Sequence, residues 1–311
     1  MANFKLSSIQ AKMNDRRRVN GPAEGTRCPV FSCHVDTAST PTRPQRQPLE
    51  TGLTRSASGS SYIEVQPSPP PASYKSLIPH SSSLKLACSV HGPKPLPRSA
   101  AFSPNLVLTT HVKYATFATR KRRAHVRDAS ERDLGVHLET ALRGAIIADR
   151  WPKSGIDVTV TILEAEDDRW WADAPDSHDA SWGMMNVLAG CITAASAALA
   201  DAHIDCLDLV TGGMAALVSD DETPGAPPKL VLDVDPSEHR SIVAACVVGY
   251  MPSRDEITQL WLKGDSSQAV LEDGDKRTAH EALIDGAVTA AKSVHAVLAE
   301  VVRESILAAS Q

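Results

Sequence analysis

Aromatic residues are scarce in this chain: four Phe, four Tyr and five Trp make up 4% of its 311 residues. Proteins that hold single-stranded nucleic acid commonly stack successive bases on a series of exposed aromatic rings. The sequence contains no such series, so we do not expect it to read individual bases. Any contact with nucleic acid would have to be made mainly through phosphate groups.

Cysteine is also sparse, and its spacing is that of neither a metal site nor a disulfide framework. No two of the six cysteines form a Cys-x-x-Cys pair, and residues 1–8 lack the apolar core of a secretory signal. We therefore expect free thiols in a reducing compartment, with no metal and no cofactor. The six are Cys28, Cys33, Cys88, Cys191, Cys206 and Cys246.

Positive charge is concentrated in two places, although the formal net charge of the chain is −5. Residues 1–50 carry eight Lys and Arg against four Asp and Glu, and a second basic cluster lies between residues 120 and 127. Such a distribution favours contact with a polyanion at restricted places rather than over the whole surface. The second cluster consists of Arg120, Lys121, Arg122, Arg123 and Arg127.

Two stretches are rich in Pro, Ser and polar residues and show no sustained periodicity. Residues 1–47 form a basic segment that we expect to be a largely disordered arm. Residues 66–83 contain Pro-Ser-Pro-Pro-Pro and three consecutive serines, which predicts an insertion between two strands. Such compositions bury too little apolar surface to offset the entropy of the chain. The folded domain is therefore expected over residues 48–308.

The remaining sequence mixes strand and helix patterns. Residues 156–163 alternate apolar and polar side chains, as a strand does. Residues 130–149 place apolar side chains at intervals of three and four, which predicts a helix with Ser130 as N-cap and Asp133 as its capping-box partner. The pattern predicts one α+β domain with helices packed on a sheet. Further strands are expected at 61–65, 84–90, 105–112, 207–218, 230–233 and 242–250, and further helices at 187–202 and 279–306.

Residues 184–204 are apolar enough and long enough to span a membrane. They are rich in small residues, and Asp201 interrupts their end. We therefore expect a helix that packs inside a soluble domain, and no membrane contact.

Four short motifs occur in a fixed order over the second half of the predicted hairpin and the region that follows it. In this order they resemble the ribonuclease PH family over roughly residues 48–308. The resemblance implies the ribonuclease PH-like (S5 domain 2-like) α+β fold. The motifs are Val90-His-Gly-Pro93, Ala141-Leu-Arg143, Pro152-Lys-Ser-Gly-Ile-Asp157 and Ala198-Leu-Ala-Asp-Ala202.

Within this family, Asp15-Arg-Arg-Arg18, the Trp151 that precedes the third motif, and Cys191-Ile-Thr193 are similar to ring subunits of the eukaryotic RNA exosome. The resemblance implies a ring of six ribonuclease PH-like proteins around an RNA channel, covered by S1/KH-type cap proteins. The partners it implies are the other ring subunits, a cap subunit, and RNA in the channel. It also implies work in rRNA processing and mRNA decay, and a location in the nucleus, nucleolus and cytoplasm.

Active members of the family hold phosphate in a Gly-Gly-Thr-Arg turn that follows a strand. At the corresponding stretch this chain has Asp167 and Asp168 in place of the glycines and Trp170 in place of the arginine. Glycine lets backbone N–H groups approach an anion, whereas two carboxylates repel it. We expect residues 166–183 to form an acidic, Trp-containing insertion that cannot hold phosphate.

Two further positions depart from the active pattern. Of the acidic pair of the family, Asp233 is present but its partner position holds His239, and the substrate-binding arginine corresponds to Ser130, with Arg127 and Arg132 nearby. The resulting hypothesis is a non-catalytic structural subunit of the exosome ring, with no catalytic residue. The alternatives are an active phosphorolytic 3′–5′ exoribonuclease and a relative that binds RNA outside any ring.

Two surface features have more than one interpretation. The basic cluster at 120–127 either contacts RNA phosphates or is a charged loop that faces solvent or an acidic neighbouring subunit. Trp170, Trp171 and Trp182 either anchor a partner or cover their own domain.

Overall fold

The computed structural model describes residues 31–32, 46–47, 49–65, 84–97, 99, 101–119, 122–126, 128–165, 182–219, 228–234, 242–264 and 278–309. In chain order the elements are β1 (Phe31–Ser32), β2 (Arg46–Gln47), β3 (Leu49–Thr51), β4 (Gly59–Val65), β5 (Leu84–Pro95), β6 (Val107–Tyr114), α1 (Ala129–Arg143), a 3-10 turn (Ala148–Arg150), β7 (Ser154–Glu164), α2 (Trp182–Asp201), β8 (Thr211–Val218), β9 (Lys229–Leu232), β10 (Ile242–Met251), β11 (Glu256–Gly264) and α3 (Ala279–Ala309).

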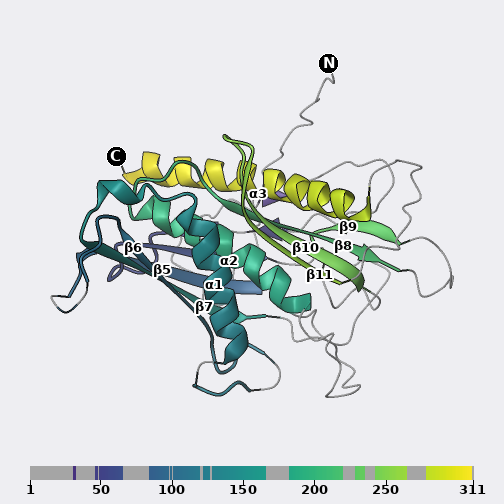
Figure 1. Cartoon of the computed structure of the whole chain (residues 1–311), viewed down its shortest axis with the longest axis horizontal. Coiled ribbons are helices and arrows are strands. Elements are labelled where there is room, and N and C mark those ends of the chain that lie inside the picture. The colour runs from purple at the N-terminus through teal and green to yellow at the C-terminus, as the bar shows by residue number, and fades with distance from the viewer. Residues whose placement is uncertain are drawn as a thin grey trace.

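Two sheets form the body of the domain (Figure 1). The five-stranded sheet has the order β3-β4-β5-β7-β6, and the four-stranded sheet has the order β11-β10-β8-β9. Neighbouring strands are antiparallel except for β6 and β7, which run parallel with α1 as their crossover. Helix α2 contacts β4 and β5 of the first sheet and β8 and β10 of the second, so it lies between the two.

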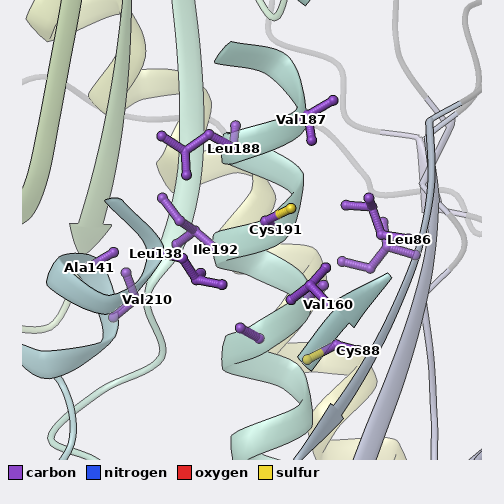
Figure 2. Close-up of a cluster of buried hydrophobic side chains, with 14 of the residues drawn as sticks. Leu86, Cys88, Leu138, Ala141, Val160, Val187, Leu188, Cys191, Ile192 and Val210 are labelled. Atoms are coloured by element: carbon purple, nitrogen blue, oxygen red, sulfur yellow. The ribbon is translucent and has the colours of Figure 1, made fainter. Parts of the chain in front are cut away.

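Helix α2 is buried on every side because its sequence is small and apolar all round. Figure 2 shows Val187 and Cys191 pointing toward β5 and β7, whereas Leu188 and Ile192 point toward Leu138 of α1. All five side chains are at most 3% exposed. One core cluster therefore joins α1, α2 and both sheets.

The five-stranded sheet is apolar on one face and polar on the other. Along β5, Leu84, Leu86, Cys88 and Val90 are buried, and the residues between them are half-buried. Strand β7 repeats this alternation with four buried aliphatic residues, which confirms the period-two prediction. The buried face packs toward α2, and the polar face carries Thr, Ser, His, Lys and Asp side chains.

The four-stranded sheet is covered on both faces. All eight residues of β8 are buried, and α3 packs on the face opposite α2. A Cβ atom at Gly212 would lie 2.2 Å from the Ala189 carbonyl oxygen of α2, and one at Gly213 would lie 2.2 Å from the Ala287 carbonyl oxygen of α3. Two adjacent glycines thus let β8 touch the backbones of both helices.

Several boundaries differ from those predicted. Helix α1 ends at Arg143 rather than 149, α2 begins at Trp182 rather than 187, and β11 was not predicted. Trp182 and Gly183 therefore belong to α2 and not to the acidic insertion. Within the predicted arm, β1 and β2 form an antiparallel pair. The other arm residues, the 66–83 insertion and residues 166–181 lie outside the described residues.

The described thiols and helix α2 follow the sequence expectations. The four described cysteines are free. Burial raises the pKa of the Cys191 thiol to about 12 and, together with the nearby Asp205 charge, that of Cys206 to about 11. Both α2 and α3 are long and apolar enough to cross a membrane, but 72% of the apolar window of α2 is buried inside the domain.

Candidate functional site

The parallel pair β6 and β7 brings two predicted site segments to one edge of the sheet. Their register places Tyr114 opposite Ile162. The Ala115 N–H donates to the Ile162 carbonyl at 2.8 Å, and the Ala165 N–H donates to the Ala118 carbonyl at 3.0 Å. The basic segment 115–127, here called the β6–α1 loop, therefore starts beside the point where the chain enters the predicted phosphate-cradle stretch. The carboxyl ends of parallel strands are a usual place for ligands.

A buried carboxylate fixes both ends of the β6–α1 loop. Glu131 of α1 is 3% exposed. Its Oε1 accepts a hydrogen bond from the Tyr114 N–H at 2.9 Å, and its Oε2 accepts one from the Asp128 N–H at 3.2 Å. Tyr114 precedes the loop and Asp128 follows it, so one side chain closes the loop. Sequence reasoning missed Glu131, because the contact with β6 is not visible in a local pattern.

Contacts inside the β6–α1 loop hold one of its arginines on the domain and leave another exposed. The Arg123 N–H donates to the Thr116 carbonyl at 3.2 Å, and its guanidinium lies 3.9 Å from the centroid of the Tyr114 ring. Lys113 Nζ donates to the His125 carbonyl at 3.1 Å. Arg123 is therefore half-buried on its own domain, whereas Arg122 is exposed. The other predicted RNA-contact residues, Arg120, Lys121 and Arg127, lie outside the described residues.

Carboxylates occupy the N-terminus of α1. A helix N-terminus is a ready anion site, because its first backbone N–H groups lack partners inside the helix. Here Asp128 is the N-cap: its Oδ1 accepts from the Ala129 N–H at 2.7 Å, and it forms a capping box with Glu131. The prediction of Ser130 as N-cap was wrong. The Ser130 hydroxyl lies in the first turn, 3.5 Å from Asp128 Oδ2. The position that corresponds to the substrate-binding arginine of active family members is therefore an uncharged serine.

The predicted acidic pair is only partly described. Asp233 follows β9 with a left-handed backbone (φ 55°), and its N–H donates to the Met214 carbonyl at 2.8 Å. Its side chain is half-buried. Its predicted partner position, His239, and the three cradle positions Asp167, Asp168 and Trp170 lie outside the described residues.

Trp182 begins α2 and covers its own domain. Its side chain is 7% exposed and belongs to the main core cluster. Lys263 Nζ of β11 lies 4.9 Å from the centroid of its ring. Of the two interpretations for the tryptophans, Trp182 thus fits the structural one. Among the described residues, no group of three or more His, Cys, Asp and Glu side chains could hold a metal ion.

Comparisons with known proteins agree with the motifs. Residues 45–205 match domain 1 of the 3′ exoribonuclease family, RNase_PH. The chain is 48% identical to exosome complex component MTR3 of Chaetomium thermophilum, over 94% of this chain and 100% of that protein. It is 30% identical to mtr3 of Schizosaccharomyces pombe, over 83% and 88%. The crystal structure of rice Rrp46 has a similar fold, with a TM-score of 0.58, 14% identity, and coverage of 86% of this chain and 98% of that one.

Proposed function

We infer, because the chain belongs to the ribonuclease PH family of 3′ exoribonucleases, that it is a non-catalytic structural subunit of an RNA exosome ring. The predicted family and the α+β fold are confirmed. One observation carries the assignment to the ring: a relative named as an exosome complex component matches this chain along its own full length. In this role the chain supports 3′–5′ processing and decay of RNA, including rRNA processing and mRNA decay, by associated nucleases.

The absence of catalysis is supported by the charges at the shared end of β6 and β7. Phosphorolysis needs hydrogen-bond donors and cations around inorganic phosphate. The described residues place two carboxylates there, Asp128 and Glu131, whose oxygens accept the Asp128 and Ala129 N–H groups at the start of α1 and the Tyr114 N–H at the end of β6. The sequence adds Asp167 and Asp168 where glycines would be required.

The partners follow from ring membership. We propose direct contacts with other ribonuclease PH-like subunits, a contact with an S1/KH cap subunit, and RNA passing through the central channel. The basic cluster of the β6–α1 loop would meet RNA phosphates, with a contribution that is independent of sequence and weakened by salt. The chain would act in the nucleus, nucleolus and cytoplasm, where fluorescent tagging at the native locus can test it.

Native co-purification tests ring membership. A tag on the chain, followed by mild lysis and mass spectrometry, should recover the other ribonuclease PH-like subunits and the S1/KH cap subunits in comparable amounts. Recovery of the chain alone, or only as a homo-oligomer, would favour an RNA-binding relative outside the ring.

A phosphorolysis assay separates the scaffold from its main rival, an active exoribonuclease. The purified chain should release no nucleoside diphosphate from single-stranded RNA when inorganic phosphate is added. An active ribonuclease PH enzyme serves as the positive control under the same conditions. Phosphate-dependent release by this chain, above that of a mock purification, would overturn the non-catalytic assignment.

A further inference from the structure

Phe117 of the β6–α1 loop is the most exposed large apolar side chain among the described residues, at 73%. Exposed single hydrophobic residues are common on protein surfaces and need no explanation by themselves. Phe117 differs because the backbone on both sides of it is anchored, and because an exposed arginine, Arg122, lies on the same loop.

The anchors hold the ring outward. On one side, the Ala115 N–H donates to the Ile162 carbonyl at 2.8 Å. On the other, Ala118 and Thr119 are buried, at 3% and 7% exposed, and the Ala118 carbonyl accepts the Ala165 N–H at 3.0 Å. With these neighbours fixed in the domain, the Phe117 ring has little freedom to fold back onto its own surface.

Residues 122–126 form the return limb of the β6–α1 loop, and they bring positive charge back toward the segment that carries this ring. The Arg123 N–H bonds the Thr116 carbonyl, directly before Phe117, at 3.2 Å, and the adjacent Arg122 is exposed. Lys113 Nζ holds the return limb through the His125 carbonyl at 3.1 Å. The loop thus presents one exposed aromatic ring and one exposed arginine on a frame closed by Glu131.

We propose that Phe117 is a stacking platform for one base of single-stranded RNA, with the exposed Arg122 of the β6–α1 loop on a flanking phosphate. The proposal rests on the proposed function, in which RNA passes this subunit, and it adds a base contact to the phosphate contacts. Stacking accepts any base, because every base has a π-face. A single platform therefore suits a chain that has few aromatic residues and does not read sequence.

An acidic segment of a neighbouring protein would also suit the arginines, but the ring favours RNA. A protein anchor normally seats its aromatic side chain in a pocket of the partner and surrounds it with contacts that exclude water. A strand of RNA needs only a ring face and nearby cations, which is what the described loop offers.

The test measures RNA binding by the assembled ring that contains variants of this chain. Two probes of equal length are compared by fluorescence anisotropy in phosphate-free buffer: oligouridylate and the same strand with abasic sites. Phe117→Leu should weaken binding of the base-containing strand about 5- to 150-fold and leave the abasic strand unchanged. Phe117→Tyr should restore binding, since it keeps the ring. Val136→Ser, which removes an exposed apolar side chain from α1, is the matched control.

Arg122→Ala separates this proposal from the phosphate contact on which it builds. This substitution should weaken the binding of both RNA strands to the ring and make that binding less dependent on salt. If the Phe117→Leu ring and the unsubstituted ring bind oligouridylate with equal affinity, stacking is refuted. If Arg122→Ala still weakens binding in that case, the phosphate contact of the proposed function stands. Failure of Phe117→Leu to enter the ring would assign the side chain to a protein contact instead. An unsubstituted ring that binds neither strand would overturn the RNA role itself.

Discussion

The two sheets of this domain use their faces in opposite ways. The four-stranded sheet is enclosed between α2 and α3, and every residue of β8 is buried. The five-stranded sheet buries one face against α2 and keeps Thr, Ser, His and Lys side chains on the other. The first arrangement demands small residues and close backbone contact, whereas the second leaves a surface that can change without disturbing the core.

This difference separates the structural part of the chain from the part that is available for contacts. The four-stranded sheet and α3 bury a core cluster of their own between them. The five-stranded sheet supports the β6–α1 loop at its β6–β7 edge and a polar face beside it. Substitutions at matched positions of the two sheets should therefore have very different effects.

Gly213→Val in β8 should have the largest effect. Its side chain would start 2.2 Å from the Ala287 carbonyl oxygen and 2.4 Å from the Ala291 nitrogen, and both obstacles are backbone atoms of α3. We expect the free energy of unfolding to fall by more than about 4 kcal/mol, beyond the usual cost of overpacking. Urea denaturation followed by circular dichroism measures it. A loss below about 1 kcal/mol would show that α3 can move away from the sheet.

Leu86→Ala tests whether the inner face of the five-stranded sheet is as demanding. Leu86 is fully buried beside Gly190 of α2. Truncation should leave a cavity and lower the free energy of unfolding by about 3 kcal/mol. The same denaturation experiment applies. A cost close to that of a surface substitution would mean that only the four-stranded sheet is tightly packed.

The pH dependence of stability at His137 tests the contact between α1 and β11. Helix α1 packs on β6 of the five-stranded sheet, and β11 belongs to the other sheet. Its ring stacks on Trp261 with 4.7 Å between centroids, and its Nδ1 lies 2.8 Å from Gln259 Nε2. Burial lowers the pKa of His137, and the nearby Asp133 charge partly offsets this. Below about pH 6.5 the unfolded chain binds the proton more readily, so stability should fall as the pH is lowered through this range.

The size of this pH effect should be less than about 1 kcal/mol, because solvent screens a half-exposed ring. His137→Phe keeps the stacked ring and removes the titration. Thermal unfolding of both chains between neutral and mildly acidic pH should show the unsubstituted chain losing more stability. Parallel pH curves would rule out His137 as the cause.

Thr159→Val, on the outer face of β7, should have the smallest effect. Thr159 lies opposite Ser89 of β5 and His111 of β6 and is half-buried. Valine has nearly the same shape, so the free energy of unfolding should change by no more than about 0.5 kcal/mol. A loss comparable to that of Leu86→Ala would show that this face is as closed as the inner one.

Much of the fold could be predicted, because the elements that build the core have regular patterns. The alternation in β7 and the small-residue helix α2 are visible in the sequence. Strand β11 is not, because a bulge between Gly249 and Tyr250 shifts its pairing with β10. The pattern along β11 is irregular in consequence: Gln259 is buried, whereas Ile257 and Leu260 are exposed.

The candidate site was less accessible to sequence reasoning. The charge of the β6–α1 loop is visible in the sequence, but its closure is not, because Glu131 reaches a backbone N–H seventeen residues away in sequence, on another element. Two overlapping capping patterns start at Asp128 and Ser130, and the structure uses the first, whose Glu131 also accepts the Tyr114 N–H. The residues around Phe117 are likewise held by hydrogen bonds with Ile162 of β7 and with Ala165, which follows β7.

Helix α3 has a consequence for how the chain is made. It supplies the cover for the outer face of β8 and β10, and Ser305 near its end meets Thr51 at 2.8 Å, 254 residues earlier. A nascent chain on the ribosome therefore holds an uncovered apolar sheet until α3 emerges. Because such distant contacts form slowly, we expect the domain to fold as one event only after α3 is available and to depend on chaperones during that interval.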